Sequence, residues 1–267
     1  MKITFYGVCG SSPSITKDLP NIKHTACVAV ETDDCLIIFD AGSGIINLGN
    51  ALTDVAKPIL LFFSHFHYDH IIGLPYFSPL YDPNHNITII YPDIKKIKSI
   101  LPKIFDSDFF PISYSQLPKE MPVKTPDFCS NFNVSVTSYN LNHPGGCYGY
   151  RLNHHKNSLI YATDNQLDSK NITPFIDSFK DCDVLIHDCY FFNESQENLK
   201  TWGHTFLPDL VSLCFKANIH HLIPFHYKPD ISKEYLSNMI TYLDSHISKN
   251  KSSLRYTFPY DDLTIHL

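Results

Sequence analysis

The fold is decided by residues 59–70, which read ILLFFSHFHYDH. The first five are apolar, which is typical of a strand buried on both faces of a layered sheet. His65, His67, Asp69 and His70 follow within six positions, and an extended backbone directs His65 and His67 to the same side. A short loop with these four groups can present two of them to each of two adjacent metal ions. The competing interpretation, a surface cluster of His and helix caps, leaves the buried strand before them unexplained.

Composition and charge narrow the class of protein. The 267 residues are 43% hydrophobic and 18% charged, as in an ordinary soluble globular protein, and their number fits one large domain. The net charge of −6 argues against a broad basic surface for nucleic acid. The 15 His are many and favour a metal site. No apolar run approaches the roughly 18 residues that a membrane helix needs.

The cysteines indicate the compartment. Eight Cys are scattered along the chain, and no two form a CxxC pair. A chain of this length does not need disulfides, and no secretory signal is seen before the first predicted strand. We therefore expect reduced, buried Cys in a cytoplasmic protein without a membrane segment.

Apolar periodicity predicts a layered architecture. Strands are predicted at 3–8, 26–31, 36–39, 59–63, 87–91, 132–139, 148–152, 159–162, 184–186, 221–225 and 257–266. Helices are predicted at 42–52, 94–104, 174–179, 207–217 and 232–248. Strands precede helices in each half, which fits an αββα four-layer sandwich of the α/β (α+β) class, built as one domain over residues 1–267.

Two segments leave alternatives open. Residues 106–131 break the pattern and are rich in Pro, so we expect a long excursion there. Its Phe109, Phe110 and Tyr114 could pack in the core, stack on a base or lie at a dimer interface. The basic helix at 94–104 is expected to present a solvated face, with a phosphate-facing surface as the less favoured interpretation.

The loop at 65–70 resembles the HxHxDH signature of the metallo-β-lactamase superfamily. The resemblance extends from Gly7 to His226 and omits the excursion. It implies the αββα sandwich and a two-metal hydrolase. It also implies the ligand set: His65, His67 and His143 for one ion, Asp69, His70 and His226 for the other, and Asp164 as the bridge. Imidazole and carboxylate suit Zn²⁺ first, with Mn²⁺ or Fe²⁺ as alternatives, and two such ions lower the pKa of a shared water toward 7.

The finer resemblance is to the branch with ribonuclease Z and cyclic-nucleotide phosphodiesterases. Residues 7–13 and 39–44 resemble two loops of that branch, which implies that Asp40 braces the metal loop. Asp188, followed by the Gly-His-Thr element at 203–205, resembles its acid–His pair. The resemblance implies that Asp188 orients His204 and that His204 protonates the leaving oxygen. We count Asp69, Asp188 and His204 as catalytic; the alternative makes His204 a neighbour of a helix N-cap and Asp188 a turn residue.

One departure from the branch shapes the predicted substrate. Ribonuclease Z carries a basic, Gly-rich arm between its third His and its bridging Asp. Here 20 residues separate His143 from Asp164 and read as a hairpin. We therefore expect a metal-dependent phosphodiesterase for a small phosphodiester, such as a cyclic mononucleotide, with transfer RNA less favoured. Lactone or thioester hydrolysis, RNA 3′-end processing and a metal-retaining binding module are the alternatives; a homodimer is expected, as is common in this branch.

Overall fold

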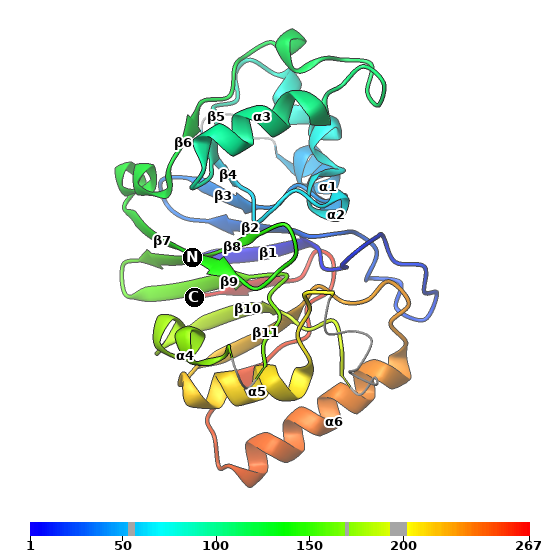
Figure 1. Cartoon of the computed structure of the whole chain (residues 1–267), viewed down its shortest axis with the longest axis vertical. Helices are drawn as coiled ribbons and strands as arrows, with labels where there is room; N and C mark the ends of the chain where they lie inside the picture. Colours follow the sequence, from blue (N-terminus) through cyan, green and yellow to red (C-terminus); the bar gives the residue numbers. More distant parts are fainter. Residues whose placement is uncertain (53–56, 169–170, 193–201) are drawn as a thin grey trace.

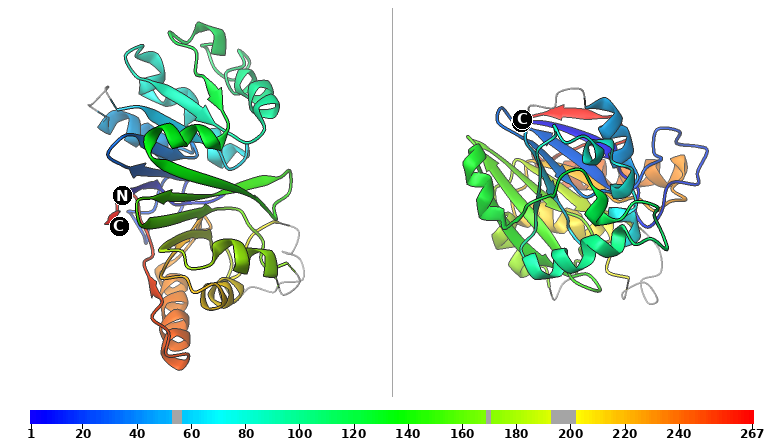
Figure 2. Two further views of the ribbon diagram at one scale, coloured as in Figure 1. Left: turned by 90° about the vertical axis from the view of Figure 1, so that its left-hand side faces the viewer. Right: turned by 90° about the horizontal axis from the view of Figure 1, so that it is seen from above.

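Two mixed β-sheets lie face to face in the computed structural model, and helices cover the outer face of each sheet (Figures 1 and 2). The structure describes residues 1–52, 57–168, 171–192 and 202–267. The layers follow the predicted αββα order, so the predicted fold is confirmed.

The first sheet is built mainly from the N-terminal half. Its strands, in spatial order, are β13 (Thr264–His266), β1 (Lys2–Gly7), β2 (Cys27–Glu31), β3 (Leu36–Phe39), β4 (Ile59–Phe62), β5 (Ile87–Ile90) and β6 (Val123–Lys124). Strands β3 to β6 run parallel, while β13, β1, β2 and β3 pair antiparallel. All four residues of β4 are buried, as expected for an interior parallel strand covered on both faces.

The second sheet is built from the C-terminal half of the chain. Its strands are β12 (Arg255–Tyr256), β11 (His221–Phe225), β10 (Val184–Asp188), β9 (Asn157–Ala162), β8 (Cys147–His154) and β7 (Val134–Leu141). β7, β8 and β9 form an antiparallel meander, and β9 to β12 are parallel. Each sheet thus contains four parallel strands, β3 to β6 in the first and β9 to β12 in the second, and the carboxyl ends of β3, β4, β9, β10 and β11 meet at one edge of the sandwich.

Helices alternate with the parallel strands more than the sequence pattern indicated. The helices are α1 (Gly44–Ala51), α2 (Tyr68–Ile71), α3 (Ile94–Ile104), α4 (Thr173–Phe179), α5 (Leu207–Lys216) and α6 (Lys233–Lys249). α1 connects β3 to β4, and α5 connects β10 to β11, because parallel neighbours need a crossover. At the start of α3 the Asp93 side chain accepts the backbone N–H of Lys96, and at the start of α6 the Ser232 side chain accepts the backbone N–H of Tyr235.

Three buried layers follow from this arrangement. Aromatic side chains of both sheets fill the space between them; the rings of Phe39 and Tyr161 stack with centroids 4.7 Å apart. α1 and α3 cover the outer face of the first sheet, while α4, α5 and α6 cover that of the second. Ile37 and Phe39 of β3 face the inner layer and Ile38 faces the outer one, so a continuous apolar run suits both.

The segment 106–131 adds structure that its sequence did not reveal. It contains β6, which extends the first sheet beside β5, and the 3₁₀ helices η3 (Tyr114–Gln116) and η4 (Pro126–Phe132). Phe110 and Tyr114 pack against the outer layer of the first sheet, whereas Phe109 is exposed. Core packing therefore explains two of the three aromatic residues and leaves Phe109 free for contact.

The other whole-chain expectations can also be compared with the structure. All eight Cys are buried and free, as expected for reduced thiols. Across the described ranges, we find no helix with the length and apolarity to cross a membrane. The predicted single domain and the cytoplasmic location stay predictions.

Candidate metal centre

The candidate site lies where the parallel strands of both sheets end. Asp40 follows β3 and His65 follows β4 in the first sheet. Asp164 follows β9, Asp188 ends β10 and His226 follows β11 in the second. The rigid strands thus deliver side chains from distant parts of the chain to one edge of the sandwich.

Three residues at these strand ends adopt a left-handed backbone conformation. The φ angles are +61° at Asp40, +50° at Asp164 and +61° at His226. Residues with a side chain adopt this conformation rarely, at a cost on the order of 1–3 kcal/mol each. All three side chains point into the same cluster, so the strained turns are the means by which the chain directs them there.

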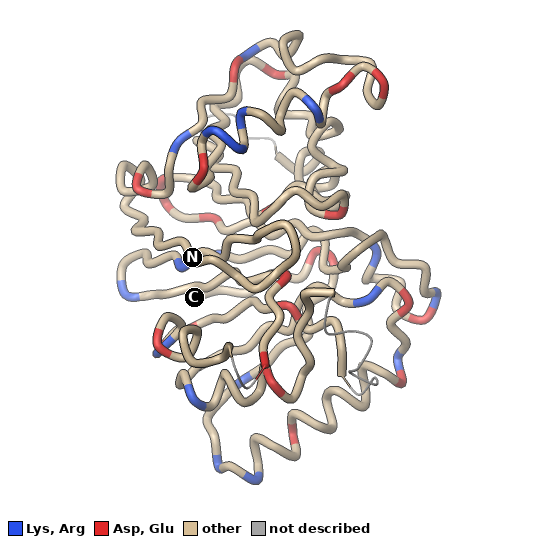
Figure 3. Tube along the Cα trace, viewed as in Figure 1, with Lys and Arg blue, Asp and Glu red and all other residues tan. Residues whose placement is uncertain are grey.

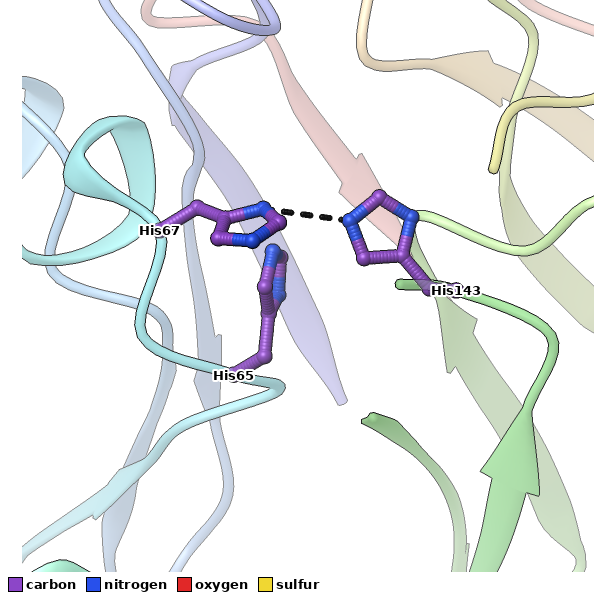
Figure 4. Close-up of side chains that lie close together, drawn as sticks. All are labelled: His65, His67 and His143. Carbon is purple, nitrogen blue, oxygen red and sulfur yellow. Dashed lines mark hydrogen bonds between the residues drawn. The ribbon is translucent and has the colours of Figure 1, made fainter. Parts of the chain in front are cut away.

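Three imidazoles form the first group of candidate ligands (Figure 4). His65, His67 and His143 each offer one nitrogen, and these atoms lie within 4.8 Å of one another. His143 Nε2 is 3.1 Å from His67 Nδ1. His143 Nδ1–H donates to the carbonyl of Gly203 at 3.0 Å, which leaves the lone pair on Nε2 facing the group. A Cβ at Gly203 would lie 2.4 Å from that ring, so this position needs glycine.

The second group combines one carboxylate and two imidazoles. His226 Nε2 lies 3.1 Å from Asp69 Oδ2 and 3.2 Å from His70 Nε2. His70 Nε2 lies 3.2 Å from the same carboxylate oxygen. Two ring nitrogens and an oxygen that converge in this way form a donor set that suits a divalent transition metal.

Asp164 lies between the two groups. Its Oδ2 is 3.1 Å from His65 Nε2 and 2.8 Å from His70 Nε2, and its Oδ1 is 3.1 Å from His226 Nε2. His65 Nε2 and Asp164 Oδ1 are nevertheless buried without a hydrogen bond among the described residues. Buried lone pairs that converge without hydrogen bonds are what two bound cations require, so the residues present fit a pair of metal ions.

Asp40 fixes the orientation of the metal loop, as expected. It accepts hydrogen bonds from the backbone N–H of Ser64 at 2.7 Å and from the Ser64 hydroxyl at 2.8 Å. It also accepts from Tyr161 Oη and from His70 Nδ1, each at 2.8 Å. Because His70 Nδ1 donates to this carboxylate, its Nε2 lone pair faces the second group.

The charges of the cluster also call for cations. Burial would raise the pKa of Asp164, but the imidazoles of His226, His70 and His65 lower it well below its usual value. Burial would lower the pKa of His70, yet Asp69, Asp164 and Asp40 raise it well above its usual value. The buried carboxylates therefore favour positive charge on the neighbouring imidazoles, and bound divalent cations would supply such charge in their place.

His204 and Asp188 form the predicted pair beside this cluster. His204 Nδ1 lies 3.0 Å from Asp188 Oδ2 and 3.4 Å from Asp164 Oδ1. Burial would lower the pKa of His204, but the Asp188 carboxylate outweighs it, and the pKa rises to about 9. The N-cap of α5 is Phe206, two residues after His204, and no side chain caps this helix. The catalytic roles assigned to His204 and Asp188 stay predictions.

Sequence reasoning missed two residues that hold this pair and the second group together. The Tyr190 ring stacks on His204, with centroids 4.5 Å apart and planes at 13°, and its N–H donates to Asp188. The Ser11 N–H donates to Asp69 Oδ2 at 2.7 Å, and the Ser11 hydroxyl donates to Tyr190 Oη at 3.2 Å. Ser11 lies in the loop at 7–13 that was singled out, but no pattern identifies Tyr190 except its place two residues after Asp188.

A separate group of metal-binding side chains lies at the turn between β8 and β9. Asp33, His154 and His155 each place a ligand atom within 4.8 Å of the others. His154 is buried, while Asp33 and His155 are largely exposed. β8 begins at Cys147, close after His143 of the candidate metal centre, and this turn follows the other end of the strand. The group is therefore distinct from the cluster described above.

The sequence of residues 36–227 matches the family described as the β-lactamase superfamily domain. The chain belongs to the metallo-β-lactamase superfamily. Ribonuclease Z of Picrophilus torridus is 27% identical to this superfamily member over 280 aligned positions, which cover 85% of each chain.

Two solved structures show the same fold. The metallo-β-lactamase fold protein YhfI of Bacillus subtilis superimposes with a TM-score of 0.71 at 17% identity, over 99% of each chain. Yeast PDE1 superimposes with a TM-score of 0.72 at 14% identity, over 100% of this chain and 99% of its own. The predicted membership of the metallo-β-lactamase superfamily is confirmed, and the protein is a metal-dependent hydrolase with a largely buried candidate metal site of His and Asp residues. The similarity to ribonuclease Z of Picrophilus torridus agrees with the finer resemblance.

Proposed function

We propose that this protein is a phosphodiesterase for small phosphodiesters, with cyclic mononucleotides as the first candidates. The Asp188–His204 pair beside the candidate ligands carries the proposal. A pair of metal ions alone would serve lactones and thioesters as well, whereas a sugar alkoxide leaves phosphorus readily only if it receives a proton. The relative from Picrophilus torridus is by name a ribonuclease, which supports phosphodiester chemistry.

The candidate ligands form two sets, one for each metal ion, with one residue shared between them. One ion would be held by His65, His67 and His143, the other by Asp69, His70 and His226, and both by Asp164. When bound, two such ions lower the pKa of a water and neutralise charge on the phosphoryl oxygens. Zn²⁺ is the first candidate, with Mn²⁺ or Fe²⁺ as alternatives.

His204 supplies the proton in the proposed reaction. Its Nδ1–H donates to Asp188, so Nε2 is free to carry the proton that is transferred. A water oxygen forms a bond to phosphorus and releases one proton to solvent, the ester P–O bond breaks, and the proton from His204 Nε2 passes to the leaving oxygen. Solvent then returns a proton to His204. The raised pKa favours the protonated imidazole at neutral pH, and bound divalent ions would lower that pKa toward the range where a general acid works best.

The hairpin between His143 and Asp164 favours a small substrate. β8 and β9 are joined by the two residues His155 and Lys156 alone, so no arm extends there to hold transfer RNA. The net charge of −6 is likewise unfavourable for a long polyanion. RNA 3′-end processing is therefore the second candidate, supported by the name of the relative.

Replacement of His204 tests the proposed chemistry. We expect His204→Ala to lower kcat on a cyclic mononucleotide by about 10²–10⁴-fold, as for loss of a general acid. The loss should be much smaller on bis(p-nitrophenyl) phosphate, because p-nitrophenolate leaves without a proton. Metal content by plasma emission spectrometry should be unchanged. Equal losses on both substrates, with metal retained, would refute the assigned role of His204.

The alternatives are separated by substrate. Turnover of lactones or thioesters, but not of phosphodiesters, would show that the second enzyme interpretation is right. Cleavage of precursor transfer RNA at its 3′ side would favour RNA processing. The homodimer stays a prediction, which light scattering of the purified chain would test.

A further inference from the structure

An apolar pocket lies beside the metal loop. It has a volume of about 450 Å³, within the range of small-molecule sites. Residues of α2, α3 and the segment 106–131 line its walls. The residues that matter here are Phe66, Tyr68, Ile72, Tyr76, Lys103 and Phe109. We call this feature the aromatic pocket.

The aromatic pocket gathers more than half of the large hydrophobic side chains that the described residues expose. Seven large hydrophobic side chains are exposed among the described residues, and four of them line the pocket: Tyr68, Ile72, Tyr76 and Phe109. Tyr68 is 80% exposed and Phe109 is 79% exposed. Apolar side chains left in water forgo roughly 25 cal/mol per Å² of burial, and such clusters mark binding sites.

The pocket and the metal centre share one short segment of chain. His65 and His67 face the first ligand group, and Phe66 between them faces the pocket. In the next turn, Asp69 faces the second ligand group, while Tyr68 and Ile72, four residues apart, face the pocket. A molecule in the pocket would therefore lie directly behind the loop that carries the candidate ligands.

A chain of contacts joins the two sites at the surface. Lys96 Nζ lies 5.8 Å from the centre of the Phe66 ring and donates to the carbonyl of Gly145 at 3.3 Å. A Cβ at Gly145 would lie 3.9 Å from His67 Nε2, and His67 is exposed. Phe66, Lys96 and His67 thus form the surface between the pocket and the first ligand group, and we call this surface the route between the two sites.

The positive charge of α3, at one wall of the pocket, suits an anionic ligand, while Asp106 and Asp108 lie in the segment that forms another wall. α3 carries four Lys and no Asp or Glu, although the chain as a whole is acidic (Figure 3). Lys103 lines the pocket itself and Lys96 stands on the route to the metal centre. A ligand with a planar apolar part and a phosphoryl group matches both the aromatic walls and these cations.

We propose that the aromatic pocket binds the planar apolar group of the phosphodiester substrate, such as a nucleobase, while the phosphoryl group lies at the metal centre. This inference rests on the proposed function, and it adds that the organic part of the substrate determines specificity. Tyr68, Tyr76 and Phe109 contact the base. Lys103 and Lys96 favour the anion along the route between the sites.

Two ligand pairs test the pocket, one by turnover and the other by binding alone. The first pair is adenosine 3′,5′-cyclic monophosphate and its abasic analogue, methyl riboside 3′,5′-cyclic phosphate, compared by kcat/KM with the metal-loaded full chain. The second pair is adenosine 5′-monophosphate and ribose 5-phosphate, compared by calorimetric titration. We expect the wild type to prefer the base-bearing member of each pair at least tenfold, in line with the strength of base stacking on aromatic side chains.

The variants are chosen to change that preference alone. Phe109→Ala and Tyr76→Ala should each reduce both ratios at least fivefold, while Tyr260→Ala, an exposed aromatic outside the pocket, should leave them unchanged. Thermal unfolding shows whether each variant is folded. Equal use of both members of each pair by the wild type would overturn the pocket and leave the phosphodiesterase proposal intact.

Two further outcomes of these experiments would separate the pocket from the proposed function. If the protein hydrolyses no phosphodiester but still binds adenosine 5′-monophosphate selectively through Phe109, the proposed function is wrong and the pocket stands. If light scattering shows that Phe109→Ala or Tyr76→Ala dissociates a dimer while both ratios stay constant, the pocket is an interface between two copies and the proposal is wrong.

Discussion

At the scale of single residues, the role of Tyr190 can be predicted from its stacking on His204. The ring holds the imidazole from one face while Asp188 holds it from the edge. We expect Tyr190→Leu to lower kcat on a cyclic mononucleotide between about tenfold and a hundredfold, because a small displacement of a catalytic group costs that much. Tyr190→Phe keeps the stack and loses only the contact with Ser11, so its kcat should fall less than threefold.

Leaving-group dependence shows whether Tyr190 acts through His204. If it positions the general acid, Tyr190→Leu should lose little activity on bis(p-nitrophenyl) phosphate, as predicted for His204→Ala. A merely structural role would lower the rates on both substrates equally and would lower the temperature of unfolding to match. Equal kcat values for the Leu and Phe variants would show that the stack is irrelevant.

At the scale of elements, Asp261 connects the segment between β12 and β13 to the loop before β2. Its Oδ2 accepts backbone N–H bonds from Lys23 at 2.9 Å and His24 at 3.1 Å. Burial raises the pKa of this carboxyl to about 7. A raised pKa in the folded state means that the stability due to this group is present below about pH 4 and is lost as pH rises through about 7.

Asp261→Asn should therefore remove part of the pH dependence of stability. We expect the free energy of unfolding, measured by urea denaturation, to fall less between pH 4 and 7 in the variant than in the wild type. The exposed Asp108, replaced by Asn, is the matched control and should follow the wild type. A variant whose curve runs parallel to the wild type over this range would contradict the assignment.

The elements also show what could be predicted from sequence and what could not. β3, α3 and β11 have the predicted bounds, because each is a clear local run of apolar or amphipathic residues. β6 was missed because two residues in a Pro-rich segment form a strand only through pairing with β5. The left-handed turns at the strand ends were missed too, since the enrichment of Asp and His in that conformation is too weak to identify single positions.

At the scale of the whole molecule, the candidate metal centre joins the two sheets. Four candidate ligands come from the loop after β4 of the first sheet, and three follow strands of the second: His143, Asp164 and His226. Ions bound between them connect the sheets at one edge, and a ligand that binds only the folded state stabilises it. Metal binding should therefore set much of the stability of the chain.

Removal of the metal tests this connection. At a metal concentration one hundred times Kd, binding stabilises the fold by about 2.7 kcal/mol. For a chain of this size, that corresponds to a fall in Tm of about 5–10 °C on chelation. Asp164→Asn should lose most of the difference between metal-loaded and chelated protein, because it removes the carboxylate shared by both ligand groups.

An ion bound by Asp33, His154 and His155 has to be distinguished from the ions at the metal centre. We expect two ions per chain in the wild type and in His155→Ala, since this residue lies outside the metal centre. A third ion that disappears in His155→Ala would belong to that group and leave the stability argument untouched. A Tm that does not change on chelation, with less than one ion bound per chain, would mean that the sheets hold together without metal and that the converging side chains are only a buried ion-pair network.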